Sequence, residues 1–424
     1  MNPPDNAQQV TPRSYVPQDT LYVWTLVNPA QPVLTGAVGL SQLVPNCATF
    51  TYAADWWQFA LSEDLPLLPG HLFSANHKDS APGAIDDARP DRWGERIIRH
   101  IDRPARLSIL EMLLFAGDDR FGALGISTSA DQYMPRYLSP YPQLKDLAQL
   151  ATAVEDVQSQ APITAEIQRL IQPGVTLGGA RPKALLQTDN GPCVIKFSEV
   201  DDPVDTPLIE HATMTLAAQA GLYVANTAVL PLPMRHGKLR HALTIERFDR
   251  LGPYRVHCQS AHTALRAAGL EQSYSNLATI LLRLGHPDRQ AAMREELFKR
   301  MVFNILMDNT DDHERNHCIS LNLADGYYDL TPAYDVVPSL QNLGYQALIV
   351  GTAGAESSLE NALTQINEYA IKKSRAIALV RQVATIVDRW VSHFSALGVS
   401  PSDMELLASS IDRDALRLQR QAFL

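Results

Sequence analysis

A helix that is apolar along its length and ends in acids, amides and histidines is the feature that most constrains this chain. Residues 293–307 read MREELFKRMVFNILM, and apolar side chains such as Leu297, Met301 and Ile305 recur there with helical period, which predicts a buried helix. Residues 308–317 then read DNTDDHERNH. A surface helix needs no such ending, whereas an active site needs polar residues that are rigidly held.

A hairpin and a further aspartate follow this loop. HCISLNL and YYDL are predicted strands around the turn ADG, and Asp335 comes just after the second strand. Phosphoryl transfer needs a carboxylate that orients the attacking hydroxyl, and amide and carboxylate oxygens that hold Mg²⁺. The spacing from Asp311 to Asn316 matches the D-x-x-x-x-N of protein-kinase catalytic loops, and Asp335 has the place of the kinase metal aspartate.

Two alternatives remain open for this loop. Asn309, Asp311 and Asp312 are residue types that cap chain turns without any chemistry. His313 and His317 beside carboxylates are compatible with zinc or manganese, although no third histidine has a suitable spacing. A local hydrogen-bonding role is favoured for the histidines. The conjunction of the three kinase-ordered positions favours a metal-phosphate site.

The upstream half offers a candidate cation for phosphate. PCVIKF (192–197) is a predicted strand that contains Lys196, and Glu210 lies near the start of the next predicted helix. In kinases a strand lysine and a helix glutamate form an ion pair. The alternatives are a lysine on an exposed strand face and a first-turn glutamate favoured by the helix dipole.

Two further segments are candidates for contacting a nucleotide. In VTLGGARPK (175–183), Gly178 and Gly179 allow the backbone to approach a phosphate closely, and Lys183 adds positive charge. Neither GxGxxG nor the Walker pattern occurs, so the glycine pair is weak evidence by itself. TIERFDR (244–250), around Phe248, suits a link between two lobes that offers backbone groups to an adenine, and equally suits a solvated strand end.

The order of predicted elements indicates an α+β fold with a bilobal body, because strands dominate early and helices late. A small β-rich N-terminal module precedes a smaller mixed lobe and a mainly helical C-terminal lobe. The predicted boundaries are a loose tail at 1–19, the module at 20–140, the smaller lobe at 141–250 and the helical lobe at 251–424.

Composition excludes several classes of protein. The formal net charge of −10 argues against strong nucleic-acid binding by the chain alone, and leaves room for a basic partner. The four cysteines are far apart without CxxC spacing, so we expect buried, reduced thiols. The N-terminus lacks the pattern of a signal peptide, and no apolar run is long enough to span a membrane. We expect a cytoplasmic protein without membrane contact.

In these segments the chain resembles the HipA family, the serine/threonine kinase toxins of bacterial type II toxin–antitoxin modules. The resemblance extends from about residue 20 to 395. It rests on six segments in family order: PDRWGERII, GDDRFGAL, GGARPKALL, ERFDR, NTDDHERNH and LTPAYDVVPS. It implies a kinase-like bilobal body behind a HipA-type N-terminal module, with ATP and Mg²⁺ as cofactors.

The resemblance also implies roles for single residues in the helical lobe and the hinge. Asp311 matches the catalytic base of the family, and Asn316 and Asp335 match its Mg²⁺ ligands. Glu246 and Phe248 match the hinge whose backbone meets adenine.

In the smaller lobe, Lys196 matches the lysine that binds the ATP phosphates, and GGARPK matches the phosphate-side loop. That loop carries a serine in the family which is autophosphorylated to switch the kinase off. Thr176 occupies its place here, and the branched Cβ of threonine restricts its rotamers. Autophosphorylation at Thr176 is therefore a hypothesis.

The resemblance implies partners as well. Family toxins bind a small helix-turn-helix antitoxin, HipB-like, that contacts operator DNA, and known members phosphorylate aminoacyl-tRNA synthetases, which stops translation. One alternative is a weakly active or silent kinase body that serves as an antitoxin corepressor. Another is a kinase for a small molecule or lipid, which the absence of a basic membrane-binding face disfavours.

Overall fold

The computed structural model describes residues 15–136, 140–164, 168, 170–174, 179–233 and 239–424. Backbone contacts divide the chain into two compact units. Unit 1 comprises Met1–Trp57 and Leu67–Val200, and unit 2 comprises Gln58–Pro66 and Asp201–Leu424.

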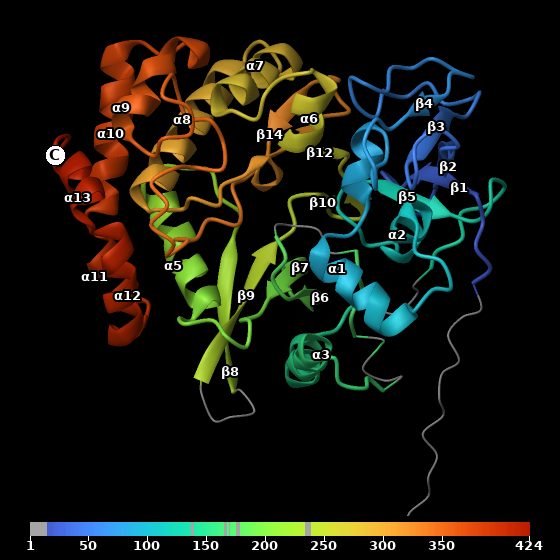
Figure 1. The fold of residues 1–424 in the computed structure, drawn as a ribbon, viewed down its shortest axis with the longest axis horizontal. Helices are drawn as coiled ribbons and strands as arrows, with labels where there is room; N and C mark the ends of the chain where they lie inside the picture. The colour runs from blue at the N-terminus through green and yellow to red at the C-terminus, as the bar shows by residue number, and fades with distance from the viewer. Residues whose placement is uncertain (1–14, 137–139, 165–167, 169, 175–178, 234–238) are drawn as a thin grey trace, which may run out of the picture. The chain divides into compact units, whose positions relative to one another are not determined.

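The first part of unit 1 is an antiparallel five-stranded sheet in the order β4-β3-β2-β1-β5 (Figure 1). Alternate side chains such as Leu21, Val23 and Phe50 are buried, as expected of strands with one face on a core. This sheet confirms the predicted β-rich N-terminal region. The strands are β1 (Thr20–Thr25), β2 (Val33–Leu40), β3 (Ala48–Tyr52), β4 (Phe73–Ser74) and β5 (Leu124–Ser127).

Short helices and a hairpin complete unit 1. The predicted helix at 90–102 is α1 followed by a π-helical turn, η2. The last two strands, β6 and β7, pair antiparallel, with Lys183 opposite Lys196. The elements are η1 (Gly83–Ala88), α1 (Arg92–Ile97), η2 (Ile98–Asp102), α2 (Ile109–Phe115), η3 (Leu144–Asp146), α3 (Leu147–Ser159), β6 (Lys183–Thr188) and β7 (Gly191–Lys196).

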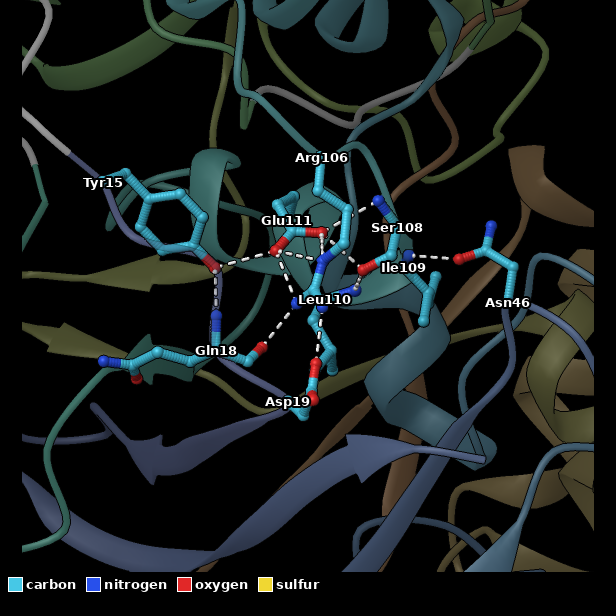
Figure 2. A network of polar contacts seen from close by, with 9 residues as sticks. All are labelled: Tyr15, Gln18, Asp19, Asn46, Arg106, Ser108, Ile109, Leu110 and Glu111. Atoms are coloured by element: carbon cyan, nitrogen blue, oxygen red, sulfur yellow. Dashed lines mark hydrogen bonds and ion pairs between the residues drawn. The ribbon is translucent and has the colours of Figure 1, made fainter. Parts of the chain in front are cut away.

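A polar network at the start of α2 holds the segment that leads into β1 (Figure 2). The fully buried carboxylate of Glu111 accepts hydrogen bonds from Ser108 N at 2.9 Å and Tyr15 OH at 2.8 Å. Arg106 Nε donates to both Glu111 oxygens at 3.1 Å, and the same guanidinium contacts Asp19. Burial and the bond to Glu111 raise the pKa of Tyr15 to about 12. Residues 1–14 of the predicted tail lie outside the described residues, and Tyr15 and Asp19 are bound to this network.

The strands of unit 2, β8 to β14, pair in antiparallel groups of two or three. β8 pairs with β9, β10 with β11, and β12, β13 and β14 form a three-stranded sheet in that order. The predicted hairpin after the acidic loop is β13–β14. The bounds are β8 (Thr227–Pro233), β9 (Leu239–Glu246), β10 (Arg250–Leu251), β11 (Tyr254–Arg255), β12 (Cys258–Ser260), β13 (Cys318–Leu321) and β14 (Tyr328–Leu330).

Helices make up most of unit 2 and share one hydrophobic core. The predicted apolar helix is α8, which packs against α7 and α10 and buries Leu297, Met301 and Ile305 completely. The helices are α5 (Thr206–Gln219), α6 (Ala261–Ala267), α7 (Tyr274–Leu284), α8 (Gln290–Leu306), η4 (Glu314–Asn316), α9 (Leu359–Ala362), η5 (Leu363–Tyr369), α10 (Lys373–Val387), α11 (Trp390–Ala396), α12 (Pro401–Ile411) and α13 (Asp414–Gln421).

These elements confirm the predicted α+β class, with a β-rich N-terminal region and a mainly helical C-terminal part. All four cysteines are buried thiols, as expected. Within the described part of the chain, no helix has the length and apolar character needed to cross a membrane.

Candidate active site

The acidic loop starts where α8 ends, and its first two residues serve the fold. Asp308 has a left-handed φ of 55° and is fully buried. Its carboxylate accepts a hydrogen bond from Arg413 Nη1 at 2.6 Å and another from the Ser410 hydroxyl. Asn309 turns back on the helix, because its amide Nδ2 donates to Asn304 Oδ1 at 3.0 Å. Asp308 and Asn309 therefore fix the direction in which the chain leaves α8.

Asp312 is also buried and bound to neighbouring side chains. Its carboxylate accepts hydrogen bonds from His317 Nε2 at 2.9 Å and from the Tyr274 hydroxyl. Burial would raise the pKa of Asp312, but the charge and hydrogen bond of His317 and the bond from Tyr274 outweigh it and lower that pKa. The local hydrogen-bonding role predicted for His317 is confirmed. Asp312 is a structural anchor of the loop.

Asp311 lies between these anchors and is exposed. Its backbone carbonyl accepts hydrogen bonds from His313 N at 2.8 Å and from Asn316 Nδ2 at 3.3 Å. The amide of Asn316 is thereby oriented within η4. Asn316 Oδ1 is buried and has no hydrogen-bond partner, which is a costly arrangement unless a ligand completes it. The structure thus brings Asp311 and Asn316 together, as predicted.

The segment before Asp335 is bonded to the residue before Asn316. The Tyr334 hydroxyl donates to the carbonyl of Arg315 at 2.8 Å. Asp335 then takes a left-handed φ of 59° and is half-buried. This conformation is uncommon outside glycine, and Asp tolerates it better than most residues. The bond between Tyr334 and Arg315 links the chain segments that carry the two predicted metal ligands.

The predicted hinge lies beside the same segment. The Phe248 ring stacks on Tyr334, with centroids 5.5 Å apart and an angle of 29° between the planes. Asp249 is fully buried and accepts hydrogen bonds from Arg247 Nη2 at 2.7 Å and Arg250 Nη1 at 2.8 Å. Glu246 ends β9, and its carboxylate accepts from Asn226 Nδ2 at 2.8 Å. The charges of ERFDR therefore stabilise the hinge segment itself.

The predicted phosphate lysine and its acidic partner are both buried, each in its own unit. Lys196 ends β7 in unit 1, and Glu210 lies in α5 of unit 2. The alternative in which Lys196 occupies an exposed strand face is thus wrong. The ion pair between Lys196 and Glu210 stays a prediction.

The glycine segment is described only in part. Thr176 and Gly178 lie outside the described residues. Gly179 has a left-handed φ of 58°, a conformation that favours glycine. Lys183, predicted to add charge for phosphate, is fully buried, and its ammonium contacts Asp91 Oδ2 at 2.5 Å and the Gly179 carbonyl at 2.6 Å. This ammonium is therefore already paired with a carboxylate.

The donor set suits magnesium better than zinc. Mg²⁺ takes oxygen ligands, and Asn316 Oδ1 and the Asp335 carboxylate are the oxygens predicted to hold it. Among the described residues, no three His, Cys, Asp or Glu side chains gather as a metal site.

Several residues that shape this site were missed in the sequence. Asp308, Tyr274 and Tyr334 act through partners that are distant along the chain, from 19 to 105 residues away, and no local pattern marks such partners. Tyr334 and Arg315 are 19 residues apart, Tyr274 and Asp312 are 38 apart, and Asp308 and Arg413 are 105 apart. Asp91, in contrast, could have been singled out from the sequence, because it lies in PDRWGERII, one of the six segments that resemble the HipA family.

Two family models match the chain. The HipA-like C-terminal domain matches residues 175–390, which is just over half of the 424 residues, and the HipA N-terminal domain matches residues 35–127. The chain belongs to the HipA family. The resemblance inferred from the six sequence segments is confirmed.

Individual relatives are more distant. A Haemophilus influenzae protein named "Putative kinase" is 26% identical over 237 residues, which are 49% of this chain and 66% of that protein. The match thus spans slightly less than two thirds of this relative's length. A chain of the Shewanella oneidensis MR-1 complex of HipA, HipB and operator DNA is similar in structure, with a TM-score of 0.64. The sequences are 16% identical, and the match covers 95% of this HipA-family chain and 97% of the other. This likeness confirms the predicted HipA-type fold.

Proposed function

We propose that this HipA-family protein is an ATP- and Mg²⁺-dependent serine/threonine protein kinase, with Asp311 as its catalytic base. The observation that carries the proposal is that the aspartates of the acidic loop differ in burial and in bonding. Asp308 and Asp312 are buried and bound to the surrounding helices, whereas Asp311 is exposed beside Asn316, whose buried Oδ1 has no partner. A merely structural loop has no reason to keep an exposed acid next to a buried, unpartnered acceptor.

In this mechanism Asp311 accepts a hydrogen bond from the hydroxyl of the substrate serine or threonine. It takes the proton as the hydroxyl oxygen bonds to the γ-phosphorus of ATP and the bond from that phosphorus to the bridging oxygen breaks, so that ADP leaves. Asn316 Oδ1 and the Asp335 carboxylate would hold Mg²⁺, which when bound neutralises charge on the phosphate oxygens. Lys196 is the proposed cation that lowers the charge of the ATP phosphates. Rate enhancement then comes mainly from positioning and electrostatics.

The remaining nucleotide contacts are part of the same proposal. The backbone of Glu246 and Phe248 meets the adenine, and the backbone of Gly178 and Gly179 approaches the phosphates. Thr176 is the candidate for autophosphorylation. The stacking of Phe248 on Tyr334 supports this arrangement, because it places the hinge segment next to the residue before Asp335.

We also propose the biological setting of the family: a cytoplasmic toxin that binds a small helix-turn-helix antitoxin and, through it, operator DNA. The solved complex of the Shewanella protein contains HipB and operator DNA, and the net charge of −10 here suits a basic partner. A translation component such as an aminoacyl-tRNA synthetase is the proposed substrate.

The deciding experiment is phosphate incorporation from labelled ATP with Mg²⁺, followed by intact mass and peptide mapping, on the protein alone and with lysate proteins. Asp311→Asn should lower transfer by about 10²- to 10⁴-fold, because it removes the general base. The thermal midpoint should not change, since Asp311 is exposed. Asp288→Asn, which changes a carboxylate that is 90% exposed, is the matched control and should behave as wild type.

Each of three results of this experiment decides between the alternatives. Phosphate on wild type but not on Asp311→Asn supports the kinase, and its position tests Thr176. Equal transfer by both proteins contradicts the assignment of the base. A wild type that binds ATP and never transfers phosphate, to itself or to lysate proteins, favours the corepressor alternative.

A further inference from the structure

The start of α1 contacts the chain on both sides of residues 175–178: it meets Pro173 before this stretch and Lys183 after it. Gly174 lies against Ala116 at the end of α2, and Gly179 is bound by Lys183. All of these contacts lie within unit 1. The N-terminal module therefore meets the described ends of the glycine segment directly.

On the C-terminal side the contact is a buried ion pair and a hydrogen bond. Asp91 Oδ2 accepts from Lys183 Nζ at 2.5 Å, and Asp91 Oδ1 caps α1 by accepting from Gly94 N at 2.9 Å. Trp93 Nε1 donates to the carbonyl of Lys183 at 2.7 Å. Lys183 Nζ also donates to the Gly179 carbonyl at 2.6 Å. Asp91 is thus connected to Gly179 through one fully buried ammonium.

On the N-terminal side the contact is a close approach of backbone. A Cβ on Gly94 would lie 2.1 Å from the carbonyl oxygen of Pro173, and a Cβ on Gly174 would lie 2.1 Å from that of Ala116. No side chain fits at either distance, so glycine is required at both positions for this packing. The sequence shows these glycines in PDRWG and in QPG, without showing that each faces a backbone carbonyl.

The anchored residue also faces the predicted phosphate lysine. Lys183 begins β6, and in the β6–β7 hairpin it is opposite Lys196. An ion pair that holds Lys183 therefore holds the strand that pairs with Lys196. Removing one member of a buried pair leaves an uncompensated buried charge, so the effect of such a change should be concentrated at this hairpin and at Gly179.

We propose that Asp91 and Lys183 form a positioning pair through which the N-terminal module sets the place of Gly179 and of the β6–β7 hairpin. Lys183 then acts as a structural counter-ion and not as a phosphate ligand. This inference rests on the proposed kinase function for its effect on nucleotide affinity, but not for its effect on the hairpin. It gives the N-terminal module a task in the kinase reaction besides any contact with partners.

Hydrogen exchange of the full-length protein tests whether the Asp91–Lys183 pair holds Gly179 and the β6–β7 hairpin in place. Asp91→Asn keeps the size of the side chain and the cap on Gly94 N but removes the charge, and should accelerate exchange about tenfold in peptides from 171 to 196. Peptides of β1, β2 and β3 should not change. The matched control is Glu95→Gln in α1, which removes a surface ion pair with Arg99 of η2. Unchanged exchange at 171–196, or an increase spread over all of unit 1, would overturn the proposal.

Steady-state kinetics test whether the Asp91–Lys183 pair affects the affinity for ATP. Asp91→Asn should raise the KM for ATP about tenfold with kcat within about twofold of wild type, and Asp91→Glu should recover part of the loss. Lys183→Met should match Asp91→Asn, and the double variant should be no worse than either single one, because both remove the same pair. A Lys183→Met variant that loses far more activity than Asp91→Asn would make Lys183 a phosphate ligand and refute the pair.

Hydrogen exchange and kinetics together distinguish a failure of the proposed kinase function from a failure of the proposed Asp91–Lys183 pair. If wild type transfers no phosphate, the kinase function fails, while the exchange experiment still decides whether Asp91 and Lys183 position the hairpin. If wild type is active and the exchange at 171–196 is the same in Asp91→Asn, only the positioning pair fails.

Discussion

The acidic loop at 308–317 and the glycine segment that ends at Lys183 are both predicted to meet the nucleotide, yet they are held differently. Asp308 and Asp312 bind Ser410 of α12, Tyr274 of α7, Arg413 before α13, and His317 of the loop itself. The described residues on either side of 175–178 are held by fewer contacts, all within unit 1: one ion pair with Asp91 and two close backbone contacts, at Gly94 and at Ala116. A loop that must present a base needs support from many directions, whereas a segment that meets phosphate through its backbone needs mainly its ends in place.

The largest effect should come from breaking the support of the acidic loop. Asp308→Ala leaves Arg413 without its buried carboxylate, and should lower the free energy of unfolding by about 3 kcal/mol. Urea titration of the purified protein measures this. Asp414→Ala, which breaks the exposed pair with Arg417, should cost less than about 1 kcal/mol. Equal effects of the two variants would show that the loop does not depend on Asp308.

The support of the glycine segment should be weaker. Gly94→Ala pushes a methyl group against the Pro173 carbonyl, and should lower the free energy of unfolding by about 2 kcal/mol, as overpacking does. The control is Gly39→Ala in β2, where a Cβ would meet its nearest atoms at 3.4 Å. This substitution should leave the free energy of unfolding nearly unchanged. A Gly94→Ala variant as stable as wild type would mean that the two backbones separate easily.

A smaller effect is expected at Asp335, which is proposed to bind Mg²⁺ together with Asn316 of the acidic loop. Asp335→Asn should weaken binding of Mg·ATP about tenfold, because a charged oxygen ligand is replaced by a neutral one. Isothermal titration calorimetry with Mg²⁺, and again with EDTA, measures the difference. Binding of ATP without metal should stay as in wild type. If the affinity for Mg·ATP is unchanged, Asp335 has no ligand role.

The smallest effect concerns acid stability at the edge of the acidic loop. Glu314 is bound to His262 Nδ1 at 2.8 Å. Burial opposes its ionisation, but the hydrogen bond from His262 prevails and lowers the pKa of Glu314 from 4.5 to about 2. A carboxyl whose pKa is lower in the folded state stabilises fully above the unfolded pKa, and this contribution disappears as the pH falls from 4.5 towards 2.

After screening by solvent we expect about 1 kcal/mol from this group. Glu314→Gln should therefore be less stable than wild type at pH 6, and the difference should vanish near pH 2. Urea midpoints across this range measure it, with the exposed Glu405→Gln as the control. A difference that does not depend on pH would rule out the ionised Glu314 carboxylate as its source.

Much of the fold was predictable because it depends on local patterns. The apolar period of 293–307 predicted α8, and the turn residues ADG predicted the β13–β14 hairpin. The six short segments predicted the HipA family, which the family models confirm. Asp311 and Asn316 were brought together as predicted, because they lie within one short loop.

The roles of neighbouring acids were not predictable in the same way. Asp308, Asp311 and Asp312 are identical side chains within five positions, and the sequence offers no means to decide which one is exposed. The choice depends on Arg413, Ser410 and Tyr274, which reach the loop only after the helices of unit 2 pack. Lys183 is similar, since its partner Asp91 is 92 residues away.

The sequence by itself determined which elements form and which residue types are present at the loop, because helical period, strand alternation and turn chemistry act over a few residues. Tertiary structure alone decided which charges are buried in pairs and which are exposed for chemistry. The physical reason is that the cost of burying a charge depends on partners that only folding brings within hydrogen-bonding distance. Asp311 and Asp312 differ in this one respect.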